Sequence, residues 1–384
     1  MLRRILFIIS IFFAANFLLA QQEYEVSVTY VSVWVKATDD KGNPVEGLKQ
    51  EDFQIFEDNV PVPITCFDEV KISEAEAAAQ KAPEQNVETA ERFVLYLDLL
   101  NTTPREYLGI KPGLMQFLDD LSKRNTEVMV AGLLPTGKLG IFAPFTKEFG
   151  KLRNLLDRAP ANAGRDTQTE SRHRDLEHIM EGAGADPIDA LRAGYSAARN
   201  YGKADQQVSE FTLHALESFA QHLIDQDFAG HLIILYVSGG FSSDPGREYF
   251  DEVDDLAKGS VEEEEMLTYS SERNFNFDFK QELQKSIGKM NRLNVTISTL
   301  DTQGMGSAAD KRESLQQVAD ETGGISFGNS QNFKEGLKSI LKDFEHQYVI
   351  CYSPPAKQKS GYKKIKVISK KPDVNLRYRQ GYSD

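Results

Sequence analysis

The sequence is poor in the residues that mark several specialised protein classes. Its 384 residues include only two cysteines and six histidines. Two cysteines exclude a disulfide-dense scaffold and a four-cysteine zinc module. No histidine stands in an H-E-x-x-H pattern, and neither a G-x-S-x-G elbow nor a Walker-type phosphate loop occurs. The usual sequence signatures of zinc hydrolases, serine hydrolases and nucleotide-dependent enzymes are therefore missing.

Positive charge is also in short supply. The chain has 44 Lys and Arg against 58 Asp and Glu, which gives a formal net charge of -14. Such a balance argues against nucleic acid or an anionic membrane surface as the partner. The hydrophobic content of 40% is that of an ordinary globular protein.

Long apolar runs are rare as well, and the one that stands out lies at the amino terminus. Arg3 and Arg4 precede an apolar stretch from Ile5 to Leu19, and Ala20 offers a cleavage point. A basic start followed by a short apolar core is typical of a secretory signal peptide, and the core is short for a membrane anchor. We therefore expect residues 1–20 to be removed. The mature protein is expected to be exported, secreted or periplasmic, with no integral membrane segment.

The two cysteines, Cys66 and Cys351, leave two alternatives open. An even number of cysteines in an exported protein permits a disulfide. Both can equally be buried thiols that act as small hydrophobic residues.

The central part of the chain begins with a pronounced strand pattern. The apolar run from Phe93 to Leu97 ends at Asp98, and hydroxyl and amide residues follow. A continuous apolar run predicts a strand buried on both faces. Open α/β sheets place their ligand sites at the carboxyl ends of such strands, which makes Asp98 a candidate site residue.

Strand and helix patterns alternate after this point. Helices are predicted at 104–123, 147–156, 187–200, 204–226, 279–293, 307–322 and 332–345, and strands at 126–134, 139–143, 231–237, 294–300 and 325–328. This alternation predicts a mainly parallel sheet with helices on both faces. Residues 160–184 are expected to be a polar surface excursion, and residues 251–278 a long acidic insertion. Its run Glu262–Glu265 is interpreted as solvated surface, with Ca²⁺ binding as the alternative.

Both ends of the chain carry β patterns without helices. Short strands are predicted at 23–36, 53–56, 60–67, 347–353, 362–369 and 375–378. Neither end is large enough for a complete sandwich. We therefore predict one antiparallel β-sandwich split into residues 22–70 and 347–384, with a linker at 71–91 and the α/β domain, residues 92–346, inserted between the halves. Cys66 and Cys351 would then lie in one sandwich, and a disulfide and two free thiols are treated as equally open.

Several segments, in their order along the chain, resemble one known family. They are DDKGNPVEGLKQEDFQIFEDNVPVPITCF at 39–67, FVLYLDLLNTT at 93–103, YVSGGFS at 236–242, ISTLDTQGM at 297–305, and the pattern from 347 to 382. Together they resemble the VWFA-related family described from acidobacteria. The resemblance implies a Rossmann-like von Willebrand factor type A (VWA) domain and a metal-ion-dependent adhesion site that holds Mg²⁺ through carboxylate and hydroxyl oxygens.

The adhesion site expected from the resemblance is degenerate. In the family's Asp-x-Ser-x-Ser frame this chain has Asp98, Leu100 and Thr102. Ala185 stands where the ligand threonine belongs, and Gly239 where the ligand aspartate belongs. Mg²⁺ requires near-octahedral oxygen coordination, so the loss of three ligands predicts no metal and no other cofactor. Residual Mg²⁺ or Ca²⁺ binding at Asp98 and Thr102 is the alternative.

Two further interpretations concern the same positions. Asp186 or Ser238 would need a shifted loop register to replace a lost ligand. Without a metal, Asp98 and Thr102 are expected to cap the helix predicted at 104–123, where an acid gains about 0.3–1 kcal/mol from the helix dipole.

The sequence thus predicts an exported, non-enzymatic, adhesion-type binding protein with a protein ligand. The partner is expected at the carboxyl-end rim of the sheet, with the insertion 244–278 setting specificity. The rim residues are Asp98, Asn101, Thr102, Asp186, Ser238 and Phe241. Two alternatives are a hydrolase with metal assistance through Asp98 and Asp301, and a structural envelope component without a discrete ligand.

Overall fold

The computed structural model describes most of the chain after the predicted signal peptide. The described residues are 30–71, 91–158, 165–182, 186–226, 231–269, 273, 277–304, 309–328, 333–355 and 361–383. The predicted signal peptide and nearly all of the predicted linker lie outside these residues. The account below concerns the unit Val31–Asp384. Among the described helices, none combines the length and the apolar character that a bilayer crossing needs.

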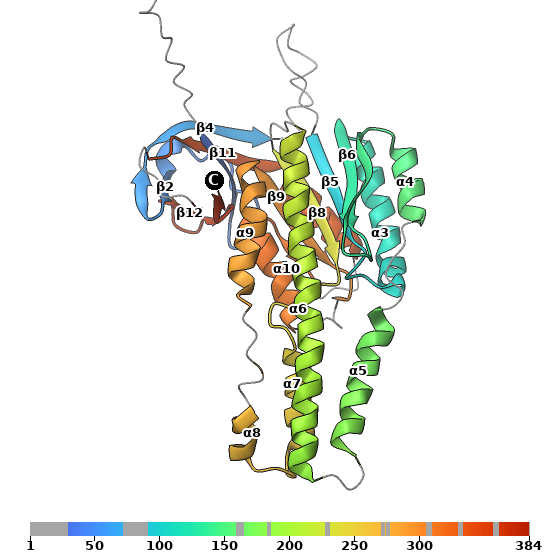
Figure 1. The fold of residues 1–384 in the computed structure, drawn as a ribbon. Helices are drawn as coiled ribbons and strands as arrows, with labels where there is room; N and C mark the ends of the chain where they lie inside the picture. The colour runs from blue at the N-terminus through green and yellow to red at the C-terminus, as the bar shows by residue number, and fades with distance from the viewer. Residues whose placement is uncertain are drawn as a thin grey trace, which may run out of the picture. The chain divides into compact units, whose positions relative to one another are not determined.

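A six-stranded sheet forms the centre of the fold (Figure 1). Its strand order is β10-β9-β8-β5-β6-β7, and all neighbours are parallel except β7, which pairs antiparallel with β6 at the edge. The strands are β5 (Glu91–Asp98), β6 (Thr126–Leu133), β7 (Leu139–Thr146), β8 (Leu232–Ser238), β9 (Val295–Asp301) and β10 (Ser326–Phe327). The prediction of a mainly parallel sheet in a mixed α/β protein is confirmed.

Helices cover both faces of this sheet, and each face has its own apolar core. One face carries α6 (Pro187–Asp225), α9 (Phe279–Arg292) and α10 (Ala309–Thr322). The other face carries α3 (Pro104–Ser122), α4 (Phe149–Arg158) and α11 (Phe333–Asp343). The sheet strands are buried on both sides because each must meet a helix layer, which explains their continuous apolar runs.

The two ends of the chain share two antiparallel sheets. One sheet has the order β13-β1-β11-β4 and the other β14-β12-β2-β3. The strands are β1 (Val31–Thr38), β2 (Phe53–Glu57), β3 (Val60–Val62), β4 (Ile64–Lys71), β11 (His346–Tyr352), β12 (Tyr362–Ser369), β13 (Asn375–Arg377) and β14 (Gly381–Ser383). Buried residues of both sheets form one apolar core. The single strand predicted at 60–67 is wrong, because it divides into β3 and β4 on either side of Pro63, which has no N–H to donate to a ladder.

The sandwich and the α/β part are in direct contact. The Trp34 ring stacks on His231 at the start of β8, with ring centroids 4.1 Å apart. The Asn291 side chain of α9 donates a hydrogen bond to the carbonyl of Gly381 at 2.8 Å. Gly288 of α9 lies so close to β14 that a Cβ atom there would sit 2.2 Å from Ser383 Oγ.

The structure has helices in two polar segments for which the sequence indicated none, and the prediction of two separate helices before β8 is wrong. The excursion expected at 160–184 contains α5 (Arg165–Met180), and the insertion expected at 251–278 contains α8 (Glu263–Tyr269) and part of α7 (Arg247–Ala257). The two helices expected at 187–200 and 204–226 are the single helix α6. Each segment has few apolar residues, but together these residues form one core when the segments pack against each other.

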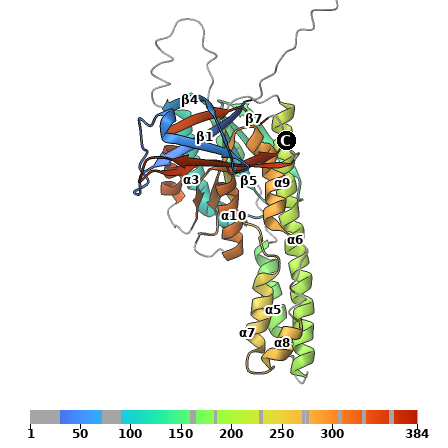
Figure 2. The ribbon, with the colours of Figure 1, turned by 90° about the vertical axis from the view of Figure 1, so that its left-hand side faces the viewer.

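These segments form a helical extension, defined as α5, α7, α8 and residues 187–208 of α6 (Figures 1 and 2). It lies beyond the carboxyl ends of the sheet strands and has its own core. The buried core residues are Leu176, Leu191, Tyr195, Ala198, Tyr249, Phe250, Val253 and Ala257. Helix α6 has 39 residues, about 58 Å at 1.5 Å per residue, and it belongs to both this core and the sheet core. The extension is therefore continuous with the sheet layer.

A charged cluster lies at the root of the extension. Asp205 of α6 accepts a hydrogen bond from Arg172 of α5 at 3.1 Å, and Tyr249 of α7 accepts another from the same guanidinium at 3.0 Å. Burial raises the pKa of Asp205 to about 6. The nearby carboxylate of Glu248 acts in the same direction, while Lys311 and Arg172 act against it.

This cluster makes the stability depend on pH. Because the folded-state pKa of Asp205 is raised from 3.8 to about 6, the folded state retains this proton between these values and the unfolded state does not. The Asp205 contribution to the free energy of unfolding is therefore largest at low pH and is lost as pH rises through about 6. Urea unfolding measures the free energy of unfolding of wild type and of Asp205→Asn at each pH. We expect the value for wild type minus the value for the variant to fall by about 2–3 kcal/mol between pH 4 and pH 7. A difference that does not change with pH would contradict the raised pKa of Asp205.

Candidate functional site

Asp98 at the end of β5 is fully buried and has a complete set of hydrogen bonds. Its Oδ1 accepts from the backbone N–H of Asn101 at 2.9 Å. Its Oδ2 accepts from Asn101 Nδ2 at 2.8 Å, from Tyr236 Oη at 2.7 Å and from Ser238 Oγ at 2.8 Å. Four donors from β8 and the loop after β5 thus surround the carboxylate, and this explains how a charged group is tolerated in the interior.

The hydrogen-bond network extends to the helix layer. Asn101 Nδ2 also donates to Thr212 Oγ1 of α6 at 2.9 Å, and Thr212 donates to the carbonyl of Val208 at 2.9 Å. The network therefore joins β5, β8 and α6, the helix that continues into the extension.

The structure also places other positions that the resemblance compares with metal ligands. Leu100 packs against the core formed with α6, α9 and α10. The N–H of Gly239 donates to the carbonyl of Asn101 at 3.1 Å. Ala185 lies outside the described residues. In the described part of the chain, no group of three or more His, Cys, Asp or Glu could hold a metal ion.

The groups that surround Asp98 also argue against a metal ion at this position. A cation at Asp98 would have to displace hydroxyl and amide donors that already occupy the carboxylate lone pairs. Thr102 Oγ1 is buried and has no hydrogen-bond partner, but it brings only one neutral oxygen. The residues present do not fit a Mg²⁺ site. The absence of metal binding stays a prediction.

The predicted capping role is wrong. The helix α3 begins after Thr103, whose Oγ1 accepts from the backbone N–H of Glu106, while Glu106 Oε2 accepts from the N–H of Thr103. This capping box, together with Pro104 at the first helical position, satisfies the helix start. Asp98 and Thr102 lie too early in the loop to do so.

The predicted partner-binding rim is also wrong in its main part. Five of its six residues are almost completely buried, namely Asp98, Asn101, Thr102, Ser238 and Phe241. Helix layers cover them: Asn101 bonds to α6, and the Phe241 ring lies 5.7 Å from that of Phe279 in α9. Asp186 alone is exposed, and its carboxylate caps α6 by accepting from the N–H of Ile188.

Asp301, the second acid of the hydrolase alternative, is close to Asp98 in the sheet. It is paired in register with Ser238 on the neighbouring strand. Its Oδ1 accepts from the N–H of Gln303, its Oδ2 has no hydrogen-bond partner, and burial raises its pKa. Only 1% of Asp301 is exposed, so a substrate has no access to this carboxyl group in the described structure.

Sequence reasoning missed two members of the network. Tyr236 could have been found, because it lies two residues before Ser238 on β8 and both side chains therefore point to the same face of the strand. Thr212 lies in the middle of a helix, 111 positions after Asn101, and no local pattern indicates it.

An aspartate at position 239 tests whether this site can hold a metal. A Cβ at Gly239 would lie 2.4 Å from the carbonyl oxygen of Asn101, so the loop would have to move. We expect Gly239→Asp to lower the free energy of unfolding by about 1–3 kcal/mol through overpacking alone and to gain no stabilisation from millimolar Mg²⁺. Gly109→Asp is the control, because a Cβ there meets nothing within 4 Å. Thermal unfolding with and without Mg²⁺ measures both effects, and a Mg²⁺-dependent rise for Gly239→Asp would contradict the prediction.

Comparisons with known proteins give limited information. No protein-family model and no curated protein matches this chain. Similar solved structures include an aerotolerance-related membrane protein from Bacteroides fragilis, with 11% identity, a TM-score of 0.32, and coverage of 66% of this chain and 98% of that one. BatB from Bacteroides thetaiotaomicron has 11% identity, a TM-score of 0.31, and coverage of 66% and 97%. The pilus adhesin SpaC from Lactobacillus rhamnosus GG has 10% identity, a TM-score of 0.33, and coverage of 90% and 49%. Likenesses of this size carry no conclusion about function.

Proposed function

We propose that this chain is an exported, non-enzymatic protein-binding protein built on a VWA-type domain whose metal site has been disabled. The observation that carries the proposal is the set of four hydrogen bonds that buried Asp98 accepts, because a cation would have to compete with these donors for the carboxylate. Support for the VWA-type assignment comes from the resemblance of the segments described above and from the acid at the carboxyl end of a central parallel strand.

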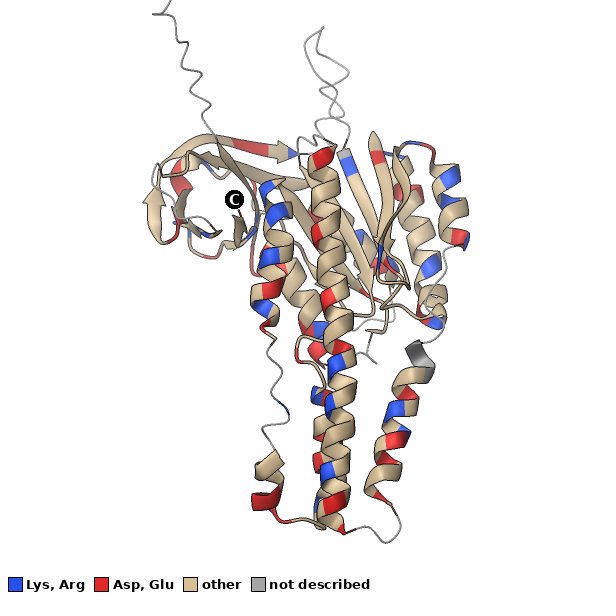
Figure 3. Ribbon diagram, viewed as in Figure 1, with Lys and Arg blue, Asp and Glu red and all other residues tan. Residues whose placement is uncertain are grey.

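The binding surface is assigned to the helical extension, because the sheet rim itself is covered. The extension has a separate core, which lets it present a surface of its own. Two leucines of the extension are exposed, Leu256 on α7 and Leu267 on α8, by 37% and 65%. Acidic residues are frequent in both helices (Figure 3). Exposed leucines on helices rich in acids suit a protein partner with apolar and basic side chains.

Crosslinking of the full chain in an exported-protein fraction tests this function. We expect wild type to capture one partner and Leu256→Asp/Leu267→Asp to lose most of it. The matched control is Leu108→Asp on α3, which replaces a leucine that is 64% exposed outside the extension. Capture that is unchanged in the extension variant, or equally lost in the control, would contradict the assigned surface. The absence of any specific partner would instead favour a structural envelope component.

A further inference from the structure

The connection between the sandwich and the α/β part passes through two adjacent strands. The chain leaves the sandwich after β4, which ends at Lys71, and returns at β11, which starts at His346. These strands are antiparallel neighbours, and His346 lies opposite Lys71. Everything from β5 to α11 is therefore inserted between two paired strands, which we call the neck.

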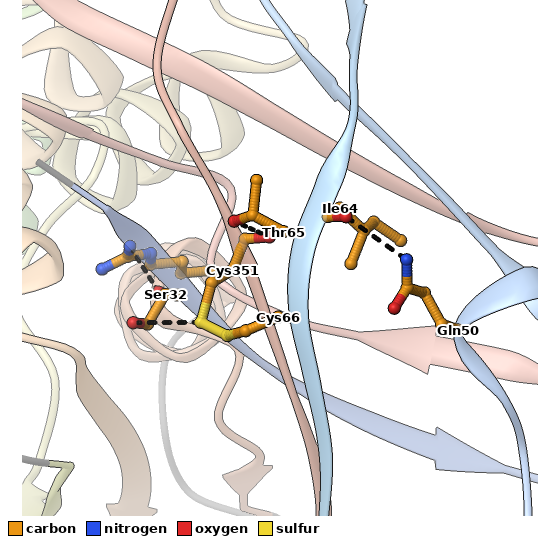
Figure 4. Close-up of a disulfide and its surroundings, with 7 residues drawn as sticks. Ser32, Gln50, Ile64, Thr65, Cys66 and Cys351 are labelled. Carbon is orange, nitrogen blue, oxygen red and sulfur yellow. Dashed lines mark hydrogen bonds between the residues drawn. A yellow bond between two sulfur atoms is a disulfide. The ribbon is translucent and has the colours of Figure 1, made fainter. Parts of the chain in front are cut away.

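The two cysteines join the strands of this neck. Cys66 of β4 and Cys351 of β11 are direct partners in the antiparallel ladder, and they form a disulfide with a Cα–Cα distance of 4.8 Å (Figure 4). Of the two alternatives that the sequence left open, the structure has the disulfide. Because β4 is the edge strand of its sheet, β11 is its only partner in that sheet.

The two sulfurs have different surroundings. Cys66 is exposed, whereas Cys351 is only 9% exposed. The hydroxyl oxygen of Ser32 on β1 lies 3.8 Å from Cys351 Sγ. Ser32 is also the cross-strand partner of Cys351. An attacking thiol can therefore reach Cys66, while Cys351 faces polar groups of the protein.

A buried cation is bonded to Ser32, the residue opposite Cys351. Arg379 is 5% exposed, and its Nη2 donates to the carbonyl of Ser32 at 2.7 Å. Its Nε and Nη1 have no hydrogen-bond partner among the described residues. The ring of Tyr382 lies 5.6 Å from the guanidinium carbon. A charged group with two nitrogens that lack hydrogen-bond acceptors is costly in the interior, and a nearby negative charge would offset that cost.

We propose that the Cys66–Cys351 disulfide is a thiol-exchange site that opens the neck in response to small-molecule thiols. A thiolate attacks Cys66 Sγ, the S–S bond breaks, and Cys351 leaves as a thiolate beside Ser32, whose carbonyl is bonded to the Arg379 guanidinium. A second thiol then attacks the mixed disulfide on Cys66, releases the two small thiols as an oxidised disulfide and leaves both cysteines reduced. Thiol–disulfide exchange is faster when the leaving thiolate is stabilised and the attacked sulfur is accessible.

Opening the disulfide leaves the neck with noncovalent contacts alone. The β4–β11 ladder remains, together with Glu69 of β4, whose Oε1 lies 2.7 Å from His346 Nε2 and accepts from Tyr348 Oη at 3.1 Å. An edge strand without its covalent tie is expected to open more often. The effect should be largest in β4 and β11, because the six-stranded sheet has separate cores.

The experiment uses the folded full chain and reduced glutathione as the probe. Mass spectrometry over time identifies which cysteine carries the mixed disulfide. We expect glutathione on Cys66 in at least about tenfold excess over Cys351 at early times, and opening faster than global unfolding, as accessibility and leaving-group stabilisation require. Glutathione mainly on Cys351, or opening only at the unfolding rate, would overturn the proposal; both outcomes are read on wild type.

Two variants test the role of Arg379 as a positioning residue. Arg379→Gln is expected to slow opening by about tenfold, whereas Arg379→Lys keeps the charge and most of the rate. Equal opening rates in wild type and Arg379→Gln would remove the cation from the proposal. Hydrogen exchange after reduction provides the second readout. We expect exchange to rise more in β4 and β11 than in β5 and β8, which change only as far as the global stability falls. An equal rise in all four strands, or unchanged protection of the neck, would show that the disulfide does not gate the neck.

Discussion

Replacing Cys66 and Cys351 together by alanine is expected to lower the free energy of unfolding by about 3–5 kcal/mol. The disulfide closes a loop with a sequence separation of 285, which includes the whole α/β part. In the chain-entropy account, a longer closed loop removes more freedom from the unfolded state. Urea unfolding at neutral pH, in oxidised protein, measures the difference between variant and wild type.

Wild type unfolded in the presence of a strong reductant should match the double variant, because both lack the same crosslink. Ser32→Ala is the control, since it removes the hydroxyl beside Cys351 Sγ but keeps the bond. Its effect should stay within about 0.5 kcal/mol. A loss below about 1 kcal/mol in the double variant would mean that the reduced, unfolded chain is already constrained at the neck.

Asp98→Ala is expected to cost a similar amount, about 3–5 kcal/mol. The substitution leaves Tyr236 Oη, Ser238 Oγ and both donors of Asn101 without their acceptor in a fully buried position. Each unsatisfied buried donor costs about 1–3 kcal/mol, and losses within one network add incompletely. Urea unfolding, with circular dichroism to verify the fold at zero denaturant, measures the cost.

The matched control is Asp186→Ala, the same substitution at the other acid of the predicted rim. Asp186 is exposed and caps α6 through a single hydrogen bond to the N–H of Ile188. Loss of such a cap costs about 1 kcal/mol. If Asp98→Ala costs no more than Asp186→Ala, the network around Asp98 is not the structural centre described here.

The Asp98→Ala prediction rests on the structural role of this carboxylate. A carboxylate at the end of a central strand is well placed to hold a ligand. Here Leu100 and Gly239 supply no side-chain oxygen, and Tyr236 and Ser238 donate hydrogen bonds to the carboxylate. Asp98 is therefore a structural group that connects two strands to α6.

Local patterns were sufficient where a segment buries its side chains against many neighbours. The apolar run Phe93–Leu97 predicts a strand that is buried on both faces, whichever elements cover it. The start of the helix at Pro104 is indicated by neighbouring residues alone. The extension could not be predicted in this way. Helix α5 has few apolar residues of its own, and Leu176 is buried only because α6 and α7 cover it. Polar composition therefore indicated surface where packing between distant segments makes a core.

The sequence alone determined the mainly parallel sheet and most of its helices, because these depend on residue periodicity and residue type. Only the tertiary structure decided three further features: the burial of the predicted rim, the pairing of Cys66 with Cys351, and the continuity of α6 into the extension. Each depends on contacts between residues far apart in the chain, such as Asn101 with Thr212. Such contacts are set by how the layers pack, and a one-dimensional pattern does not encode them.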